Sequence, residues 1–237
     1  MYRWILDPAD RDAVSAHVEL RKTSHEHLVL VEISCARSSE ELLSIRTAYH
    51  ARYKRSLEEQ VYDYTKGNTR KLLIALVSAF RYEGEEINKR LAKSEAKEVH
   101  ETIKYIKLHN DDFIRIITSR SKTQLQATFN FYREGEGTSI TKMPNKSKDV
   151  LSTLRITIRC LKDPIKYFEK VLRNSIQRLG TDEDALTRVI VTSAEKDLKE
   201  IKELYCKRNS VRLDDAVDKD TKGDYKDMLL TMLGNEV

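Results

Sequence analysis

Apolar side chains recur every three or four residues along much of this chain, a spacing that predicts helices with one buried face. Three of these helical segments share one frame, in which a polar stretch precedes several apolar residues and then a tyrosine. The tyrosines are Tyr49, Tyr132 and Tyr205, which lie 83 and 73 residues apart. We therefore predict an all-α protein that is an array of multi-helix repeats of about 75 residues, three of which are present.

Polar residues mark where the shared helices begin. Ser38 is followed three residues later by Glu41, and Ser121 is followed three residues later by Gln124. In such a capping box the serine side chain accepts a hydrogen bond from the third amide of the helix, and Glu or Gln bonds back to the serine amide. The pattern predicts capping boxes after Ser38 and Ser121, and a third helix in the same frame, in which residues 194–197 precede Leu198.

A second correspondence links two segments that are 156 residues apart. Thr65-Lys66-Gly67 matches Thr221-Lys222-Gly223, and each triplet precedes an apolar helix. The same distance separates Tyr49 from Tyr205, so both pairs follow one repeat. We expect a linker at 82–88 and an irregular connection at 135–148. The predicted divisions are the end of an apolar helix at 1–13, followed by repeats at 14–84, 85–163 and 164–237.

Composition narrows the class of protein. The 237 residues include only 7 Gly and 3 Pro, which argues against a many-stranded or loop-rich fold. No stretch approaches the roughly 20 apolar residues of a membrane span, and the first residues lack a signal-peptide core. The three cysteines are far apart, which favours a reducing, cytoplasmic location. The net charge of +5 suits an anionic membrane surface, and we expect no nucleic acid partner.

The segment Gly180-Thr181-Asp182 lies between two apolar helical segments. Thr181 is predicted to be the N-cap of the second helix, whose first turn would then be acidic, as the helix dipole favours. Locally, this fits an ordinary helix–turn–helix junction. A glycine turn can also direct several carbonyl groups toward one point, and a distant carboxylate can then complete a calcium site.

These residues resemble those of the annexin family, and specifically its plant members, along the whole chain. The annexin loop pattern Gly-X-Gly-Thr-Asp is similar to the segment 178–182, and Asp220 follows 40 residues after Gly180. Further similar stretches are 6–13, 48–53, 80–82 and 219–225. The resemblance implies five helices per repeat and peripheral, calcium-dependent binding to membranes of acidic phospholipids.

The resemblance also implies a set of ligands for Ca²⁺. They are the backbone carbonyls of Ile176, Arg178 and Gly180 together with the carboxylate of Asp220. Arg178 stands where the family pattern has glycine, but its carbonyl remains. Thr221 would belong to a minor neighbouring site, although Lys226 stands where that site has an acid.

The other repeats lack the acid or the glycine. The 156-residue offset places Tyr64 at the position of Asp220, and Ser24 and Glu26 at those of Gly180 and Asp182. The 73-residue offset places Lys107 and His109 at the positions of Gly180 and Asp182. We therefore expect one calcium site. Annexins normally have four repeats, so we also expect exposed apolar surface on the fourth, weaker membrane affinity and self-association.

Several alternatives remain open. The segment 220–223 reads as the D-x-x-G of nucleotide hydrolases, but the chain has no phosphate-binding G-x-x-x-x-G-K-[ST], and the histidines form no catalytic grouping, so we expect no enzyme. A truncated annexin with little membrane activity is a further alternative. Ile114-Arg115-Ile116 resembles an actin-binding triplet, although any amphipathic helix contains such a pattern. Cys35 and Cys160 match two oxidation-responsive cysteines of plant annexins, or are buried as small hydrophobic residues.

Overall fold

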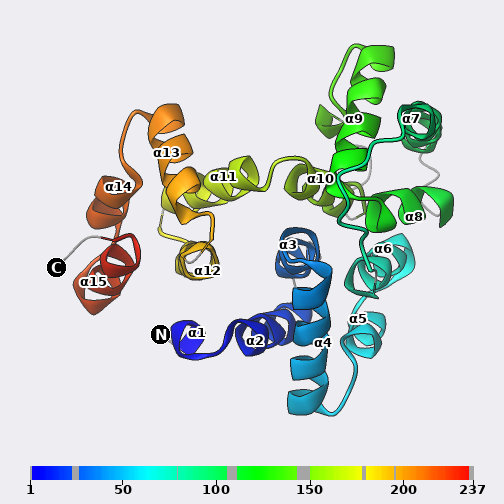
Figure 1. Cartoon of the computed structure of the whole chain (residues 1–237). Coiled ribbons are helices and arrows are strands. Elements are labelled where there is room, and N and C mark those ends of the chain that lie inside the picture. The colour runs from blue at the N-terminus through cyan, green and yellow to red at the C-terminus, as the bar shows by residue number, and fades with distance from the viewer. Residues whose placement is uncertain are drawn as a thin grey trace. The chain divides into compact units, whose positions relative to one another are not determined.

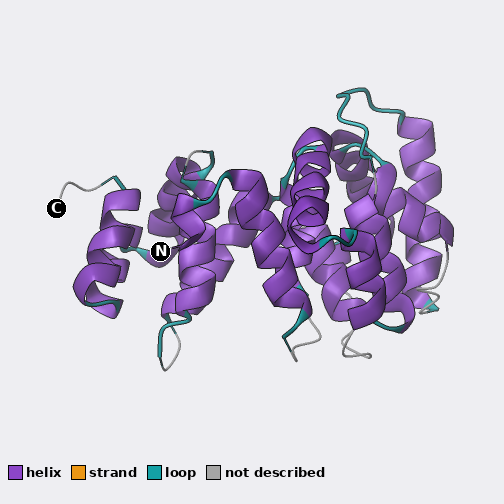
Figure 2. Cartoon of the chain, turned by 90° about the horizontal axis from the view of Figure 1, so that it is seen from below, coloured by secondary structure: helices purple, strands orange, loops and turns teal. Residues whose placement is uncertain are grey.

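The computed structural model describes residues 2–22, 27–78, 80–105, 111–142, 150–177, 180–194 and 196–234, and all side chains among them except those of residues 2, 3 and 150. Every regular element in these ranges is a helix, which confirms the prediction of an all-α fold (Figure 2).

The helices follow one another with short connections (Figure 1). In chain order they are α1 (Tyr2–Ile5), α2 (Pro8–Leu20), α3 (Leu28–Ala36), α4 (Ser39–Tyr53), α5 (Leu57–Tyr64), α6 (Gly67–Ser78), α7 (Lys89–Lys104), α8 (Asp111–Ser119), α9 (Lys122–Glu136), the 3₁₀ turn η1 (Ile140–Lys142), α10 (Val150–Lys162), α11 (Pro164–Ile176), α12 (Glu183–Ser193), α13 (Leu198–Asn209), α14 (Leu213–Asp220) and α15 (Gly223–Met232).

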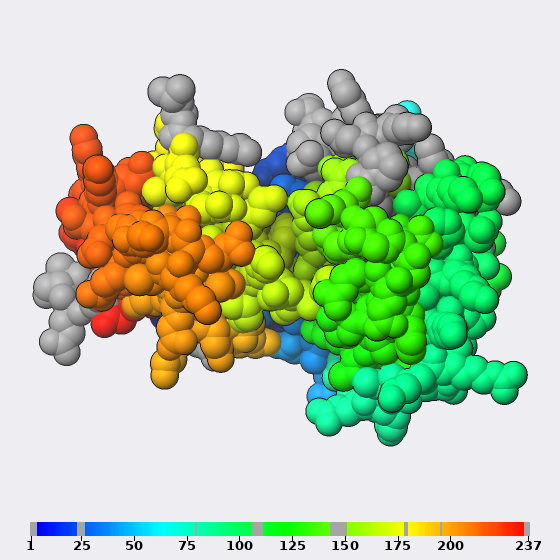
Figure 3. All heavy atoms as spheres, turned by 90° about the horizontal axis from the view of Figure 1, so that it is seen from above, coloured from blue at the N-terminus to red at the C-terminus, as the bar shows by residue number. Residues whose placement is uncertain are grey.

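The helices form two compact units, which are described separately. Unit 1 comprises Met1–Pro8 and Asp163–Val237, and unit 2 comprises Ala9–Lys162. In unit 1, α11 packs against α12, α13 and α14, and α15 packs against α12 and α14. In unit 2, α3 packs against α6 and α10, and α7 lies beside α9 on the face drawn in Figure 3. Each unit buries its own apolar side chains, so each has its own core.

The three tyrosines of the repeat occupy equivalent places. Tyr49, Tyr132 and Tyr205 are 0%, 8% and 1% exposed, so each lies in the buried face of its helix. Each of these helices ends with a left-handed residue five positions after its tyrosine: Lys54, Gly137 and Ser210, with φ of 57°, 65° and 57°. The same local geometry therefore recurs at both predicted offsets.

The 156-residue correspondence is equally close. The C-cap of α5 is Thr65 and that of α14 is Thr221, with φ of −122° and −121°. Each threonine donates from its amide and its hydroxyl to a valine carbonyl one turn earlier, in Val61 or Val217. The next helix begins in each case at a left-handed glycine, with φ of 59° and 60°. Asp220 and Tyr64 are consequently equivalent positions in the backbone.

The predicted capping box at Ser38 is confirmed, whereas at Ser121 only the serine half of the predicted box is formed. Ser38 accepts from the Glu41 amide, and Glu41 bonds back to the Ser38 amide. Ser121 accepts from the amide of Gln124, but the Gln124 side chain bonds instead to the amide and the carbonyl of Asn88. Asn88 is the N-cap of α7, so Gln124 joins α9 to the segment that precedes α7. The third helix of the frame is α13, which begins at Leu198.

The segment 82–88 has no helix, as predicted for a linker. It is held by Arg81, which is 8% exposed and donates to the carbonyls of Ile117 and Arg120 at the end of α8. The prediction for 135–148 is wrong at its start because α9 continues through Glu136. Gly137 is the C-cap that terminates the helix, since glycine adopts the left-handed conformation at little cost. Residues 143–148 lie outside the described residues.

Cys35 of α3 and Cys160 of α10 are neighbours in the core of unit 2. They are 1% and 0% exposed, and their thiols share a hydrogen bond. This hydrogen bond, together with burial, raises the pKa of the Cys160 thiol well above its ordinary value. Cys206, in contrast, is exposed on α13. Because both thiols are buried and out of reach of a dissolved reagent, the pair should be inert while unit 2 is folded.

We expect a thiol reagent such as Ellman's reagent to modify Cys206 quickly in the native protein. Cys35 and Cys160 should react at least about 100-fold more slowly, since their modification requires local opening of the core. The measurement is the time course of absorbance with and without denaturant. In the variant Cys206→Ser the rapid phase should disappear. Rapid modification of all three thiols would contradict the buried position of the pair.

Candidate calcium site

The candidate loop connects the end of α11 to the start of α12 in unit 1. The Asp182 amide donates to the Ser175 carbonyl at 2.9 Å and so closes the loop upon itself. Gly180 has a φ of 88°, which is left-handed and favours glycine, and an added Cβ would meet nothing within 4 Å. The requirement for glycine is therefore conformational and does not come from crowding. The predicted ligand Arg178 lies outside the described residues.

The N-cap of α12 is Asp182, and the prediction that Thr181 caps this helix is wrong. The Asp182 carboxylate accepts from the Ala185 amide at 3.0 Å. Glu183 and Asp184 occupy the first turn, where the helix dipole favours negative charge. Thr181 is not the cap because its hydroxyl bonds to a distant residue.

That distant residue is Asp220, the last residue of α14. The Thr181 hydroxyl lies 2.6 Å from Oδ2 of Asp220 and 3.2 Å from its backbone carbonyl oxygen. The two residues are 39 positions apart in sequence, so the fold brings this carboxylate to the loop. Both residues are half-buried, so neither is fully removed from solvent.

The position of Asp220 is electrostatically unfavourable for an acid. The C-terminal end of a helix carries a partial negative charge, so a carboxylate there is repelled by the helix dipole. Thr181 offsets part of this repulsion with its hydrogen bond. A bound cation would offset more, which makes the placement of Asp220 suitable for a metal ligand.

The other two predicted ligands differ in what they can offer. Ile176 ends α11, where backbone carbonyls have no partner within the helix and are free to bind a cation. Thr221 is 5% exposed, and its hydroxyl donates to the Val217 carbonyl at 2.7 Å, so only its own carbonyl could act as a ligand. At the neighbouring minor site, the Lys226 ammonium lies 3.0 Å from Asp218. A cation therefore stands where that site needs an acid.

The available atoms match the chemistry of Ca²⁺. This ion takes about six to eight oxygen ligands in a flexible arrangement and readily accepts backbone carbonyls with one carboxylate. Within the described ranges, no three residues of the types His, Cys, Asp and Glu group together as a metal cluster. A site made mainly of carbonyls does not require such a group, so the residues present fit calcium.

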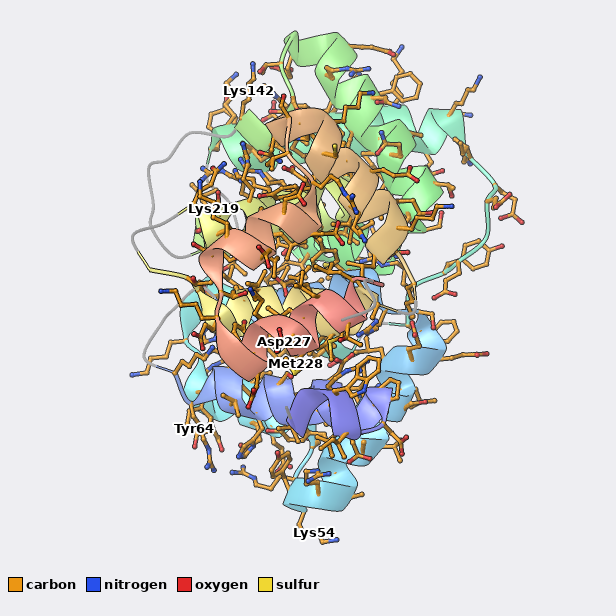
Figure 4. All side chains as sticks on the ribbon, turned by 90° about the vertical axis from the view of Figure 1, so that its left-hand side faces the viewer. Lys54, Tyr64, Lys142, Lys219, Asp227 and Met228 are labelled. Carbon is orange, nitrogen blue, oxygen red and sulfur yellow. The ribbon has the colours of Figure 1, made fainter. Side chains whose placement is uncertain are left out.

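The equivalent place in unit 2 offers a different chemistry. Tyr64 ends α5 and is 45% exposed, and a phenol cannot replace a bidentate carboxylate (Figure 4). The other substituted positions, Ser24, Glu26, Lys107 and His109, lie outside the described residues.

Two supporting contacts were not predicted from the sequence. One is the bond from Thr181 to Asp220, for which the threonine of the Gly-Thr-Asp pattern was the available signal. The other is Tyr225 of α15, whose hydroxyl lies 3.2 Å from the Glu183 carbonyl and 2.9 Å from the Thr187 hydroxyl. Burial raises the pKa of Tyr225, so its hydroxyl stays protonated and can donate. These contacts fix the start of α12 against α14 and α15.

Comparison with known proteins identifies the family. The annexin sequence model matches residues 11–76, 94–145 and 167–232. Annexin-like protein RJ4 of Fragaria ananassa is 58% identical over 238 residues, which cover 100% of this chain and 76% of that protein. The chain belongs to the annexin family. The resemblance described from the loop pattern and the repeats is thereby confirmed.

Solved annexin structures share the fold. Annexin III superposes with a TM-score of 0.89 at 27% identity, covering 98% of this chain and 73% of that one. A calcium-bound form of annexin (Sm)1 superposes with a TM-score of 0.83 at 26% identity, covering 98% of this chain and 71% of the other. Calcium-dependent binding to phospholipids is the general activity of annexins. Among the described helices of this annexin, none is long and apolar enough to cross a bilayer.

Proposed function

We propose that this annexin binds acidic phospholipid membranes through one calcium ion held by the α11–α12 loop and Asp220. The observation that carries the proposal is the contact between Thr181 and the Asp220 carboxylate at 2.6 Å. This contact supports the proposal because it joins the loop to the acid that the family pattern implies 40 residues after Gly180. A loop with a left-handed glycine is also present where the carbonyl ligands are needed.

Each residue of this site has a separate task. The carbonyls of Ile176, Arg178 and Gly180 would supply neutral oxygens, and Asp220 would supply the negative charge. Thr181 orients the carboxylate, as hydrogen-bonded groups around metal ligands generally do. Because Ca²⁺ takes about six to eight oxygens, these atoms leave positions that a lipid phosphate can fill. Calcium supplies the charge that joins the protein to the anionic headgroup.

Exposed lysines near Asp220 would add an attraction that is independent of the metal. Lys219 lies in the last turn of α14 (Figure 4), Lys222 precedes α15, and both are exposed. A basic residue close to an anionic leaflet contributes about 1 kcal/mol, and this contribution falls with added salt.

Sedimentation with vesicles tests the proposal. We expect the protein to sediment with phosphatidylserine-containing vesicles in the presence of calcium and to return to the supernatant when EGTA removes it. Vesicles of phosphatidylcholine alone are the control, because they present no net negative charge. Equal sedimentation with and without calcium would contradict the proposal.

The remaining expectations stay predictions. They are the division into a remnant at 1–13 and repeats at 14–84, 85–163 and 164–237, a cytoplasmic location, self-association and the expectation of no enzyme, to which nucleotide hydrolysis at 220–223 is the alternative. Actin binding by the triplet at 114–116 also stays a prediction. Within α8 that triplet exposes mainly Arg115, since Ile114 and Ile116 are 8% and 2% exposed.

A further inference from the structure

Unit 2 contains an open groove that no part of the calcium site uses. It has a volume of about 780 Å³ and lies along α6 and α8, with Tyr62 of α5 at one side. Helices α6 and α8 pack against each other, so the two walls belong to one core (Figure 1). We call this feature the α6–α8 groove.

The rim of the α6–α8 groove is cationic. Arg70, Lys71 and Arg115 line it, together with one carboxylate, that of Asp111. The described lining residues therefore carry three positive charges and one negative charge. A second acid, Asp112, lies outside the lining and pairs with Arg115 at 3.0 Å.

Arg70 is held in position for a further partner. Its guanidinium lies 4.0 Å from the centre of the Tyr62 ring, and its Nε donates to the Thr65 carbonyl at 2.7 Å. Within the described part of the chain, this is the one hydrogen bond that the Arg70 guanidinium makes. Its two terminal nitrogens carry four more N–H groups, and such a pre-positioned fork suits the oxygens of a phosphate.

The acids beside the other two cations are weak competitors. Lys71 lies 3.4 Å from Asp111, and the Asp111 side chain is 89% exposed. The pair of Arg115 and Asp112 is also mostly exposed, at 51% and 68%. Exposed ion pairs contribute little to stability, so a phosphate can replace either acid as the partner of the cation.

The floor of the α6–α8 groove is apolar. Ile74 and Ala75 of α6 and Ile114 of α8 face it. Ile74 and Ala75 are half-buried, so part of their apolar surface remains available to a ligand. An apolar floor under a cationic rim matches a molecule that carries an anionic head next to a hydrocarbon chain, which is the chemistry of an acidic lipid.

We propose that the α6–α8 groove binds a lipid with a phosphate monoester head, with the phosphate between Arg70, Lys71 and Arg115 and the start of an acyl chain over Ile74 and Ala75. A phosphate monoester carries a charge between about −1.5 and −2 near neutral pH. This charge complements the excess of two positive charges among the lining residues. The site needs no calcium and is separate from the Asp220 loop.

The test is a calorimetric titration with dihexanoyl phosphatidic acid, used as dissolved monomers in EGTA. We expect binding to the native chain and to Asp220→Asn alike. The double variant Arg70→Gln, Arg115→Gln should bind at least about tenfold more weakly, because two bidentate phosphate contacts are lost. Ala75→Phe fills the floor without a change of charge and should also weaken binding.

Three controls distinguish the alternatives. Lys93→Gln, Lys97→Gln removes the same charge from exposed positions on α7 and should change affinity by less than about twofold. Dihexanoyl phosphatidylcholine has the same chains without net charge and should bind at least about tenfold more weakly. Inorganic phosphate has no chain and should also bind more weakly. The proposal would be overturned if dihexanoyl phosphatidylcholine or inorganic phosphate bound as tightly as dihexanoyl phosphatidic acid. It would also be overturned if the variant Arg70→Gln, Arg115→Gln and the α7 variant bound dihexanoyl phosphatidic acid with equal affinity. Circular dichroism melting confirms that each variant is folded.

Discussion

Replacing Asp220 by asparagine should raise the calcium concentration needed for half-maximal vesicle sedimentation by at least about 100-fold. Removing a group that only supports a metal ligand typically costs about 10- to 100-fold in affinity, and removing the charged ligand itself should cost more. The variant keeps the size of the side chain and one carbonyl oxygen, so the loss reports on charge and on bidentate contact. The measurement is a calcium titration with phosphatidylserine-containing vesicles.

Two further variants make this result specific. Asp218→Asn removes an acid from the same helix, one that is 57% exposed and pairs with Lys226, and it should leave the titration nearly unchanged. Thr181→Val keeps Asp220 but removes the hydroxyl that orients it, and it should shift the midpoint by about tenfold. If Asp220→Asn and Asp218→Asn need the same calcium concentration for half-maximal vesicle sedimentation, the assignment of Asp220 as a calcium ligand is wrong.

The largest expected effect on stability comes from Glu169→Ala. Glu169 lies on α11 with 0% exposure, and its carboxylate is 3.0 Å from Arg208 and 3.1 Å from Asn209 of α13. A third group, Arg173, is 3.7 Å away. Removing one partner of a buried ion pair leaves the other charges uncompensated and costs about 3–5 kcal/mol. Because both arginines are partly exposed, we expect the lower end, about 3 kcal/mol.

Urea unfolding followed by tryptophan fluorescence measures the change in the free energy of unfolding, and the fluorescent residue lies in the same compact unit as Glu169. The single tryptophan, Trp4, belongs to unit 1, as Glu169 does. Glu203→Ala on α13 is the matched control, since Glu203 is exposed and its replacement should cost less than about 0.5 kcal/mol. A small effect of Glu169→Ala would show that the buried carboxylate does not hold α11 to α13.

The sequence predicted those features of the fold that depend on local patterns. Tyr49, Tyr132 and Tyr205 were correctly matched because a buried helix face imposes the same spacing in every repeat. Thr65 and Thr221 were matched because both end a helix in the same way. Gln124 was not predicted correctly, since its side chain bonds to Asn88, and which residue lies within reach depends on how α7 packs against α9.

In the candidate site, too, local sequence patterns predicted some features, whereas others depend on how the helices pack. Thr181 was expected to cap α12 because threonine and aspartate are both good N-caps, and sequence alone does not decide between neighbours. In the structure Asp182 is the N-cap of α12, and the Thr181 hydroxyl bonds instead to the Asp220 carboxylate. Asp220 was found only through the resemblance to annexins. Nothing in a separation of 39 residues says that two side chains meet, because that depends on the packing of α12, α14 and α15.

Because Asp220 lies at the end of α14, the substitution Asp220→Asn should have opposite effects on the stability of the metal-free protein and on calcium binding. A carboxylate facing the negative pole of a helix costs free energy in the metal-free protein, so this unit is less stable than its sequence could make it. Asp220→Asn relieves that repulsion and should slightly raise the melting temperature of the metal-free chain while it weakens calcium binding. In the proposed site, relief of the same repulsion by a bound calcium ion would add to the affinity of unit 1 for calcium.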